Sequence, residues 1–262
     1  MLKKGYFRAD IERSIFDIRF FLAIIVEICL MYIASYEIMQ WRNNVMIVMY
    51  FVTNSTPFLV AYMIAAFPYS GSFAEDIEYK YYYVQLVRGD IRKYVFSKVM
   101  SIFLSTCFVM AISIWVFSLL LHIRYPWFIT GDDIYRTLIE DGSFKTLLKR
   151  EYFMLYYFCI GMQKGLFAGL LALLATIASL FYSNQLFSLT IPGLSWYVLD
   201  VLAIKFDLPE YIRLPYIFSQ NNNLGGNNII SIGVMFIVAG IGIAILKIII
   251  QKIFERRWIY AK

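Results

Sequence analysis

Six long runs of apolar residues dominate the chain, and they limit what it can fold into. A helix needs about 20 apolar residues to cross the hydrocarbon core of a membrane. Of the 262 residues, 61% are hydrophobic and only 16% are charged, which is more apolar surface than a soluble domain of this length can bury. The runs lie at roughly 20–39, 45–67, 95–122, 155–182, 185–204 and 229–251.

These runs predict an all-α integral membrane protein with six transmembrane helices. A spanning helix satisfies its own backbone hydrogen bonds, and the sequence lacks the alternating pattern of a membrane β-barrel. Pro192 and Gly193 predict an interruption of the fifth span. The predicted organisation is a single transmembrane domain over 1–262, with an amphipathic interfacial helix at 1–19, two spans within 20–68, a cytoplasmic hairpin at 69–94, four spans within 95–251 with extracellular loops near 124–151 and 205–228, and a cytoplasmic tail at 252–262.

Basic residues predict the orientation of these spans. Six spans place both termini on one side of the membrane. With the N-terminus inside, 15 lysines and arginines fall in the inner segments and 8 in the outer ones, while Lys164 falls within a span. Because basic residues favour the cytoplasmic side, we expect a multi-pass protein of the plasma membrane with cytoplasmic N- and C-termini. The net charge of +6 fits such basic cytoplasmic edges and does not indicate a nucleic-acid partner.

The first 19 residues have an amphipathic pattern. Phe7, Ile11, Ile15 and Ile18 recur at helical spacing, with charged residues between them. One interpretation is a functional helix that lies along the inner membrane interface. The other is a flanking anchor, and the sequence favours neither.

The segment from Phe73 to Lys98 is the one dense polar insert between spans. It contains three acids in four residues, then a tyrosine run, then a basic cluster. Phe73, Ile77, Tyr81 and Val84 fall near one helical face, and such a face can dock into a groove of a cytosolic subunit. The alternative is an ordinary solvated loop whose arginines snorkel.

This insert resembles the loop between the second and third spans of ABC-2 type permeases, the membrane subunits of ABC exporters. The resemblance rests on the order Glu75, Glu78, Leu86-Val87-Arg88, Gly89-Asp90, Arg92, Tyr94 and Lys98. Six spans, the amphipathic N-terminal helix and the last external loop extend it over nearly the whole chain. The Gly-Thr that often follows the second acid in this family is replaced by Tyr79-Lys80.

The resemblance implies an ABC-2 (type V exporter-like) fold and a set of partners. The chain would pair with a second permease copy or a paralogue, as a homodimer or heterodimer, and with a cytosolic ABC ATPase subunit. The N-terminal helix would also touch the ATPase, and short re-entrant helices would lie between spans five and six. The hairpin's first helix would be the coupling helix, with Phe73, Glu75, Asp76, Ile77, Glu78 and Tyr81 as the coupling residues.

No nucleotide or metal chemistry is expected in this chain. It contains no GxxxxGK[ST] motif, so ATP and Mg²⁺ would bind a partner ATPase and the chain would not be an enzyme by itself. Three cysteines in apolar runs and a single histidine, His122, form no metal-type cluster. We therefore expect no cofactor and no metal site here, and membrane lipids as the surrounding medium.

Two charges and one glycine ridge fall inside the spans. Glu27 and Lys164 would line a substrate path or pair with each other, and Glu27 has a purely structural alternative. Gly161, Gly165 and Gly169 recur every four residues, which permits close helix packing.

The function that we expect is ATP-driven export of an amphipathic substrate by alternating access. An aromatic and aliphatic interior with few intramembrane charges favours a hydrophobic or antimicrobial peptide, ahead of a lipid or a drug. A secondary transporter or channel is the alternative, followed by an intramembrane enzyme, which would need convergent reactive groups.

Overall fold

The computed structural model describes residues 6–41, 43–81, 90–129, 131–182, 185–222 and 228–256. Within these ranges the regular structure is helical and no strand is present. All six apolar runs are helical, which confirms the all-α membrane class. Five helices are long and apolar enough to cross a membrane, namely α2 (Ile18–Trp41), α7 (Ile91–Arg124), α10 (Phe153–Phe181), α11 (Gln185–Lys205) and α13 (Asn228–Phe254).

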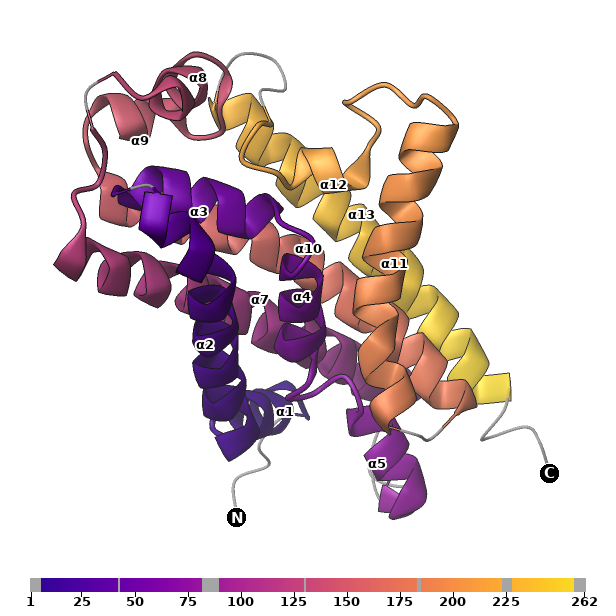
Figure 1. The fold of residues 1–262 in the computed structure, drawn as a ribbon. Helices are drawn as coiled ribbons and strands as arrows, with labels where there is room; N and C mark the ends of the chain where they lie inside the picture. Colours follow the sequence, from indigo (N-terminus) through magenta and orange to yellow (C-terminus); the bar gives the residue numbers. More distant parts are fainter. Residues whose placement is uncertain are drawn as a thin grey trace.

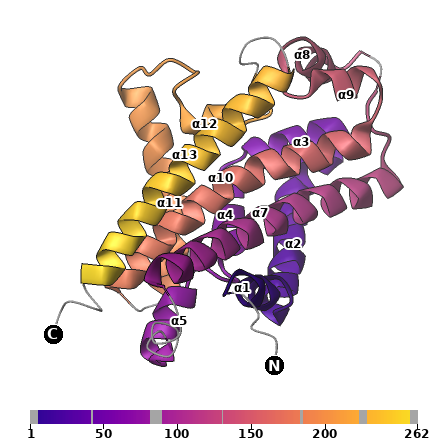
Figure 2. The ribbon, with the colours of Figure 1, turned by 180° about the vertical axis from the view of Figure 1, so that it is seen from behind.

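Helices α7 and α10 pack against each other at the centre of the bundle, with α2 on one side and α11 and α13 on the other (Figures 1 and 2). The glycine ridge of α10 faces α7. A Cβ atom on Gly161 would lie 2.8 Å from the carbonyl oxygen of Ala111, and one on Gly165 would lie 2.5 Å from that of Cys107. The ridge therefore brings two backbones into direct contact.

The second apolar run forms two helices instead of the single span expected at 45–67. Helices α3 (Val45–Asn54) and α4 (Phe58–Ala66) meet at an angle of 74°, and together they could form a sixth span. Pro57 stands at the start of α4, where it cannot donate a helical hydrogen bond and its ring clashes with the preceding turn. Asn54 Nδ2 and Ser55 Oγ donate to the carbonyls of Tyr50 and Val52, so side chains cap the broken end.

The fifth apolar run behaves in the opposite way, because α11 continues through Pro192. The predicted interruption at this position is wrong. Transmembrane helices tolerate proline where neighbouring helices support the freed backbone. The adjacent Gly193 lies against α4, since a Cβ atom here would stand 2.9 Å from Sδ of Met63.

One end of the bundle holds α1 (Tyr6–Ile15), α5 (Ser72–Glu78) and the last turn of α13 (Figure 1). The ring of Phe73 in α5 lies 5.9 Å from the ring of Phe254 in α13, and Ser97 in α7 hydrogen-bonds to Asp10 in α1. The beginning and the end of the described chain thus share one face, as an even number of crossings requires.

The opposite end is formed by the connections between the spans. It holds α8 (Asp133–Asp141), α9 (Lys145–Lys149) and α12 (Leu214–Ile217). The amide of Val45 donates to the carbonyl of Pro126 at 3.0 Å, and that of Ser143 donates to the carbonyl of Gln220 at 2.8 Å. The loop expected at 124–151 contains two short helices, α8 and α9, and it packs against the loop that carries α12.

Candidate functional site

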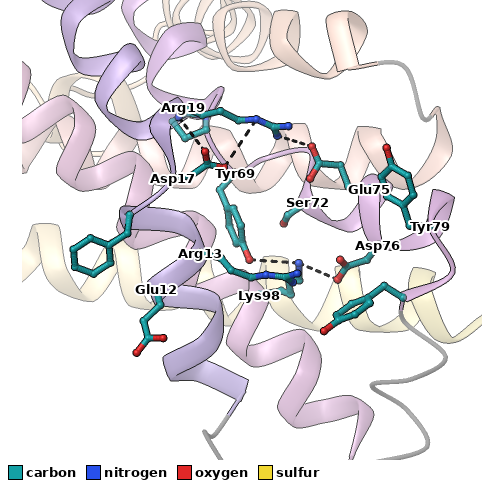
Figure 3. Close-up of a pocket in the computed structure, with 13 residues that line it drawn as sticks. Glu12, Arg13, Asp17, Arg19, Tyr69, Ser72, Glu75, Asp76, Tyr79 and Lys98 are labelled. Atoms are coloured by element: carbon teal, nitrogen blue, oxygen red, sulfur yellow. Dashed lines mark hydrogen bonds and ion pairs between the residues drawn. The ribbon is translucent and has the colours of Figure 1, made fainter.

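A cavity of about 530 Å³ lies between α1 and α5 at the end of the bundle that they share (Figure 3). Its walls come from four parts of the chain: α1, the start of α2, the turn that joins α4 to α5, and α5 itself, with Lys98 of α7 below them. The N-terminal helix predicted to lie along the interface is thus joined to the predicted coupling helix. Most of the lining side chains are charged or tyrosine.

Lys98 is the central charge of this site, and its side chain is only 2% exposed. Its Nζ atom lies 2.9 Å from Oδ2 of Asp76 in α5 and 4.0 Å from Oδ1 of Asp10 in α1. Nζ also donates to the hydroxyl of Tyr69 at 3.4 Å. One ammonium group therefore connects α7, α5 and α1 and the turn before α5.

Hydrogen bonds satisfy the two carboxylates around this lysine. Tyr94 donates to Oδ2 of Asp76 at 2.6 Å, Tyr69 donates to Oδ1 of Asp10 at 3.2 Å, and Ser97 donates to Oδ2 of Asp10. Burial, and then the negative charge of Asp10, raise the pKa of Tyr69 well above its usual value, so its hydroxyl keeps the proton that it donates. Each carboxylate is thus hydrogen-bonded and also lies near the ammonium group, which offsets the cost of burying it.

A second set of contacts fixes α5 from its other side. Arg19 at the start of α2 pairs with Glu75 through a 2.6 Å contact between NH1 and Oε1, and both side chains are partly exposed. Such a pair contributes at most about 1 kcal/mol. The apolar anchor is Phe73, whose ring is fully buried and lies 5.9 Å from the rings of Tyr94 and Phe254. Helix α5 is therefore attached to α2, α7 and α13.

The far end of α5 points away from these anchors and is exposed. Glu78, Tyr79, Lys80 and Tyr81 are all exposed, and Tyr79 is 78% exposed. The helix ends here because Lys80 adopts a left-handed conformation with φ of 54°. The guanidinium of Arg13 in α1 lies 5.1 Å from the ring centroid of Tyr81, so α1 borders the same exposed patch.

The six residues that the resemblance assigns to coupling fall into two groups. Phe73 and Asp76 are buried and hold α5 in place from its inner side. The other four are accessible to a partner: Glu75 and Ile77 are half-buried, and Glu78 and Tyr81 are exposed. The part of the motif at 82–89 lies outside the described residues. A docking partner can therefore contact the C-terminal end of α5, but not Phe73.

The roles of Asp10, Tyr69 and Lys98 were not predicted from the sequence. Lys98 was identified only as the last residue of the polar insert and of the motif shared with ABC-2 type permeases. Lys98 stands between Val95 and Val99, one turn inside an apolar helix, and that position indicates a buried lysine with an acidic partner. Asp10 lies 88 positions earlier, and no pattern in a single sequence connects the two.

The structure does not bring the two intramembrane charges together. Glu27 in α2 is fully buried beside Ser113 of α7, and neither carboxylate oxygen has a hydrogen-bond partner among the described residues. Lys164 in α10 instead donates to the carbonyl of Thr53 at 3.5 Å and lies 5.7 Å from the ring centroid of Phe58. No ion pair between Glu27 and Lys164 is present in the described part of the chain.

The described residues contain no group of three or more His, Cys, Asp or Glu side chains that could hold a metal ion.

Comparison of the chain with protein-family models, with curated proteins and with solved structures found no match.

Proposed function

We propose that this chain is the permease subunit of an ATP-driven exporter and that α5 is its coupling helix. The observation that carries the proposal is the arrangement of α5. Its C-terminal end, Glu78 to Tyr81, is exposed, while Asp76 on the inner side is bound to the buried Lys98 of α7. A short helix that is exposed at one end and anchored to three other helices is suited to transmit a displacement.

The mechanism follows from the cost of separating α5 from its anchors. Removing one partner from a buried ion pair costs about 3–5 kcal/mol. A partner that pushes on Tyr79 would therefore move α5, α1 and α7 together and would not separate α5 from the other two helices. The two states of the permease would be selected by the nucleotide-dependent affinity of the partner, which supplies the free energy.

The partners in this proposal are a cytosolic ABC ATPase, which binds ATP and Mg²⁺, and a second permease copy or a paralogue. The end that carries α1 and α5 faces the cytosol, because the inner segments hold the excess of basic residues. The chain then lies in the plasma membrane with its N- and C-termini in the cytosol. Helices α11 and α13 expose apolar side chains along much of their length, which lipid or a second copy would cover.

The exported substrate that we favour is amphipathic, with a hydrophobic or antimicrobial peptide as the first candidate. The buried helices carry aromatic and aliphatic side chains, and few charges lie within the spans. No catalytic constellation is expected in the chain, so the enzymatic step is ATP hydrolysis by the partner.

The experiment is purification of the tagged chain from its native membrane in mild detergent, followed by measurement of ATP hydrolysis. We expect an associated subunit with a phosphate-binding loop, which peptide mass spectrometry identifies. Changing Glu78→Ala and Tyr79→Arg together should remove the ATPase and its activity, because both side chains are exposed on α5. The matched control is Lys149→Ala with Tyr152→Arg at the opposite end, where both side chains are also exposed. Loss of the ATPase from both variants, or from neither, contradicts the proposal.

A secondary transporter is the second candidate, and Glu27 is the observation that favours it. A fully buried carboxyl group without a hydrogen-bond partner in the described structure is a residue that could carry a proton or bind a cation. The test uses the purified chain alone in liposomes that contain a pH-sensitive dye. A proton flux that Glu27→Gln abolishes would favour this candidate, whereas no flux from the chain alone fits the ATP-driven exporter.

A further inference from the structure

A second cavity, of about 320 Å³, lies where α3 breaks from α4, at a distance from the α1–α5 site. Its walls come from this break, from α10 and α11, and from α12 with the residues on either side of it. Helix α12 lies at the end of the bundle opposite α5 (Figure 1).

Lys164 lines this cavity and is the unusual residue in it. The side chain is buried, with 5% of the residue exposed, and an ammonium group has three hydrogens to donate. Within the described structure it makes one long hydrogen bond, 3.5 Å from the carbonyl of Thr53, and lies over the ring of Phe58. A buried ammonium with this little pairing is suited to receive an anion.

Two further charged side chains line the same cavity. Arg213 donates from Nε to the carbonyl of Leu208 at 2.6 Å, and its NH2 lies 3.9 Å from the fully exposed carboxylate of Asp207. Asp200 of α11 also lines the cavity, and no ion pair joins it to Lys164 among the residues described. The cavity thus contains two cations and one anion, a net charge of +1.

The segment after α12 is fixed in place, so the cavity is already formed. Gln220 donates to the hydroxyl of Thr53 at 2.8 Å, and Gln163 of α10 donates to the carbonyl of Ser219 at 2.6 Å. The ring of Phe218 stacks on that of Phe167 with centroids 5.3 Å apart and an interplanar angle of 8°. A preformed cavity binds a ligand without the cost of ordering its walls.

Aromatic side chains supply the apolar part of the lining. Trp196, Tyr216 and Phe58 line the cavity together with the charged groups. A lining that combines cationic groups with aromatic rings matches a molecule with an anionic head and an apolar body.

We propose that this cavity binds the anionic group, a carboxylate or a phosphate, of an amphipathic molecule. Lys164 and Arg213 are the charge partners of that group, and Trp196, Tyr216 and Phe58 contact its apolar portion. Asp200 opposes the binding of an anion and so limits its affinity. If the chain is the exporter proposed above, this site defines the substrate class, but the binding itself does not depend on an ATPase.

The test uses Trp196 as the reporter, because bromine quenches tryptophan fluorescence on contact. The purified full chain is placed in nanodiscs of neutral phosphatidylcholine. Three brominated probes are then titrated separately: phosphatidylglycerol, a fatty acid, and phosphatidylcholine. The difference between the wild type and Trp196→Phe isolates the signal of the cavity. The phosphatidylglycerol arm tests a lipid phosphate, and the fatty-acid arm tests a free carboxylate.

We expect at least one of the two anionic probes to quench Trp196 at lower concentration than phosphatidylcholine does. Lys164→Gln should weaken this binding by about tenfold or more, the scale of a hydrogen bond to a charged group. Lys164→Arg should retain it. Asp200→Asn should strengthen it, because it removes a negative charge from the cavity. The matched control is Lys149→Gln, which removes an exposed lysine from α9 and should change nothing.

The opposite signs expected for Lys164→Gln and Asp200→Asn keep the test decisive even if one variant folds poorly. Equal quenching by all three probes would overturn the proposal. Weaker anion binding after Asp200→Asn would overturn it too, because it would mean that Asp200 supports Lys164 as an internal pair. Loss of ATPase association in the earlier experiment would leave these outcomes unchanged, so the two proposals fail separately.

Discussion

At the scale of single residues, Lys98 determines the charge balance of the α1–α5 site. Its ammonium group lies near the carboxylates of both Asp10 and Asp76, and all three side chains are buried. Two buried carboxylates without a cation would carry an uncompensated charge in a medium of low dielectric constant. Three tyrosine and serine hydroxyls share these carboxylates, but hydroxyl groups cannot neutralise them.

Lys98→Met should therefore destabilise the protein by about 3–5 kcal/mol, because it leaves two buried carboxylates unpaired. The measurement is denaturant unfolding of the purified chain in detergent. Adding Asp76→Asn to this variant should recover part of the loss, since one of the two charges is then removed. The matched control is Lys93→Met, which removes an exposed lysine from the same helix and should cost less than about 0.5 kcal/mol. Equal losses in the two lysine variants would show that Lys98 does not hold the site together.

Some features of the α1–α5 site follow from local sequence patterns, and others depend on tertiary packing. The helical spacing of apolar residues predicted an amphipathic helix within the first 19 residues, where α1 lies, and the run of acids identified the segment that contains α5 as a polar insert. Burial of Lys98 depends on Asp10, Tyr69 and Asp76, which come from three other segments. Such an arrangement is produced by tertiary packing, so local periodicity predicts neither the pairing nor the inward direction of Asp76.

Among the helices, two prolines had opposite effects: one helix breaks at Pro57, and another continues through Pro192. The spacing of apolar residues alone does not distinguish the two cases. Pro57 follows Asn54-Ser55-Thr56, whose side chains can satisfy the carbonyls freed by a break, and here the chain bends by 74°. Pro192 stands directly between Ile191 and Gly193, without a run of three polar residues before it, and the helix continues while the glycine packs against Met63. The polar residues before Pro57 were the signal that could have predicted the bend.

The contact between α10 and α7 provides a prediction at this scale. Gly165→Ala should destabilise the protein by about 1–3 kcal/mol, because its Cβ would lie 2.5 Å from the backbone carbonyl of Cys107, which cannot move without shifting α7. Gly240→Ala in α13 is the matched control, since a Cβ there meets nothing within 4 Å. Both substitutions gain the same helix propensity, so their difference in thermal unfolding midpoint isolates the packing effect. Equal midpoints would contradict close backbone packing at this ridge.

In the molecule as a whole, contacts between distant segments hold each end of the bundle together. Helix α1, helix α5 and Phe254 meet at one end, while the connections near Asn44, Asp132 and Ser143 meet at the other. Six apolar runs predict an even number of crossings, and the described helices allow five or six. The single helix expected at 45–67 is instead the bent pair α3 and α4, because the length of an apolar run does not reveal a bend within it.

The last prediction tests the orientation of the whole molecule. In a chain with Cys29, Cys107 and Cys159 replaced, Tyr79→Cys lies at the end of α5 and Asp207→Cys in the loop after α11, both on exposed side chains. A membrane-impermeant maleimide should label Asp207→Cys in intact cells and Tyr79→Cys only in inverted vesicles, because six crossings with a basic inner face place them on opposite sides. Labelling of both from one side would mean that α7, α10 and α11, the three helices between them, do not all cross the membrane. Labelling with the sides exchanged would place α5 outside the cell, where no cytosolic ATPase could act on it.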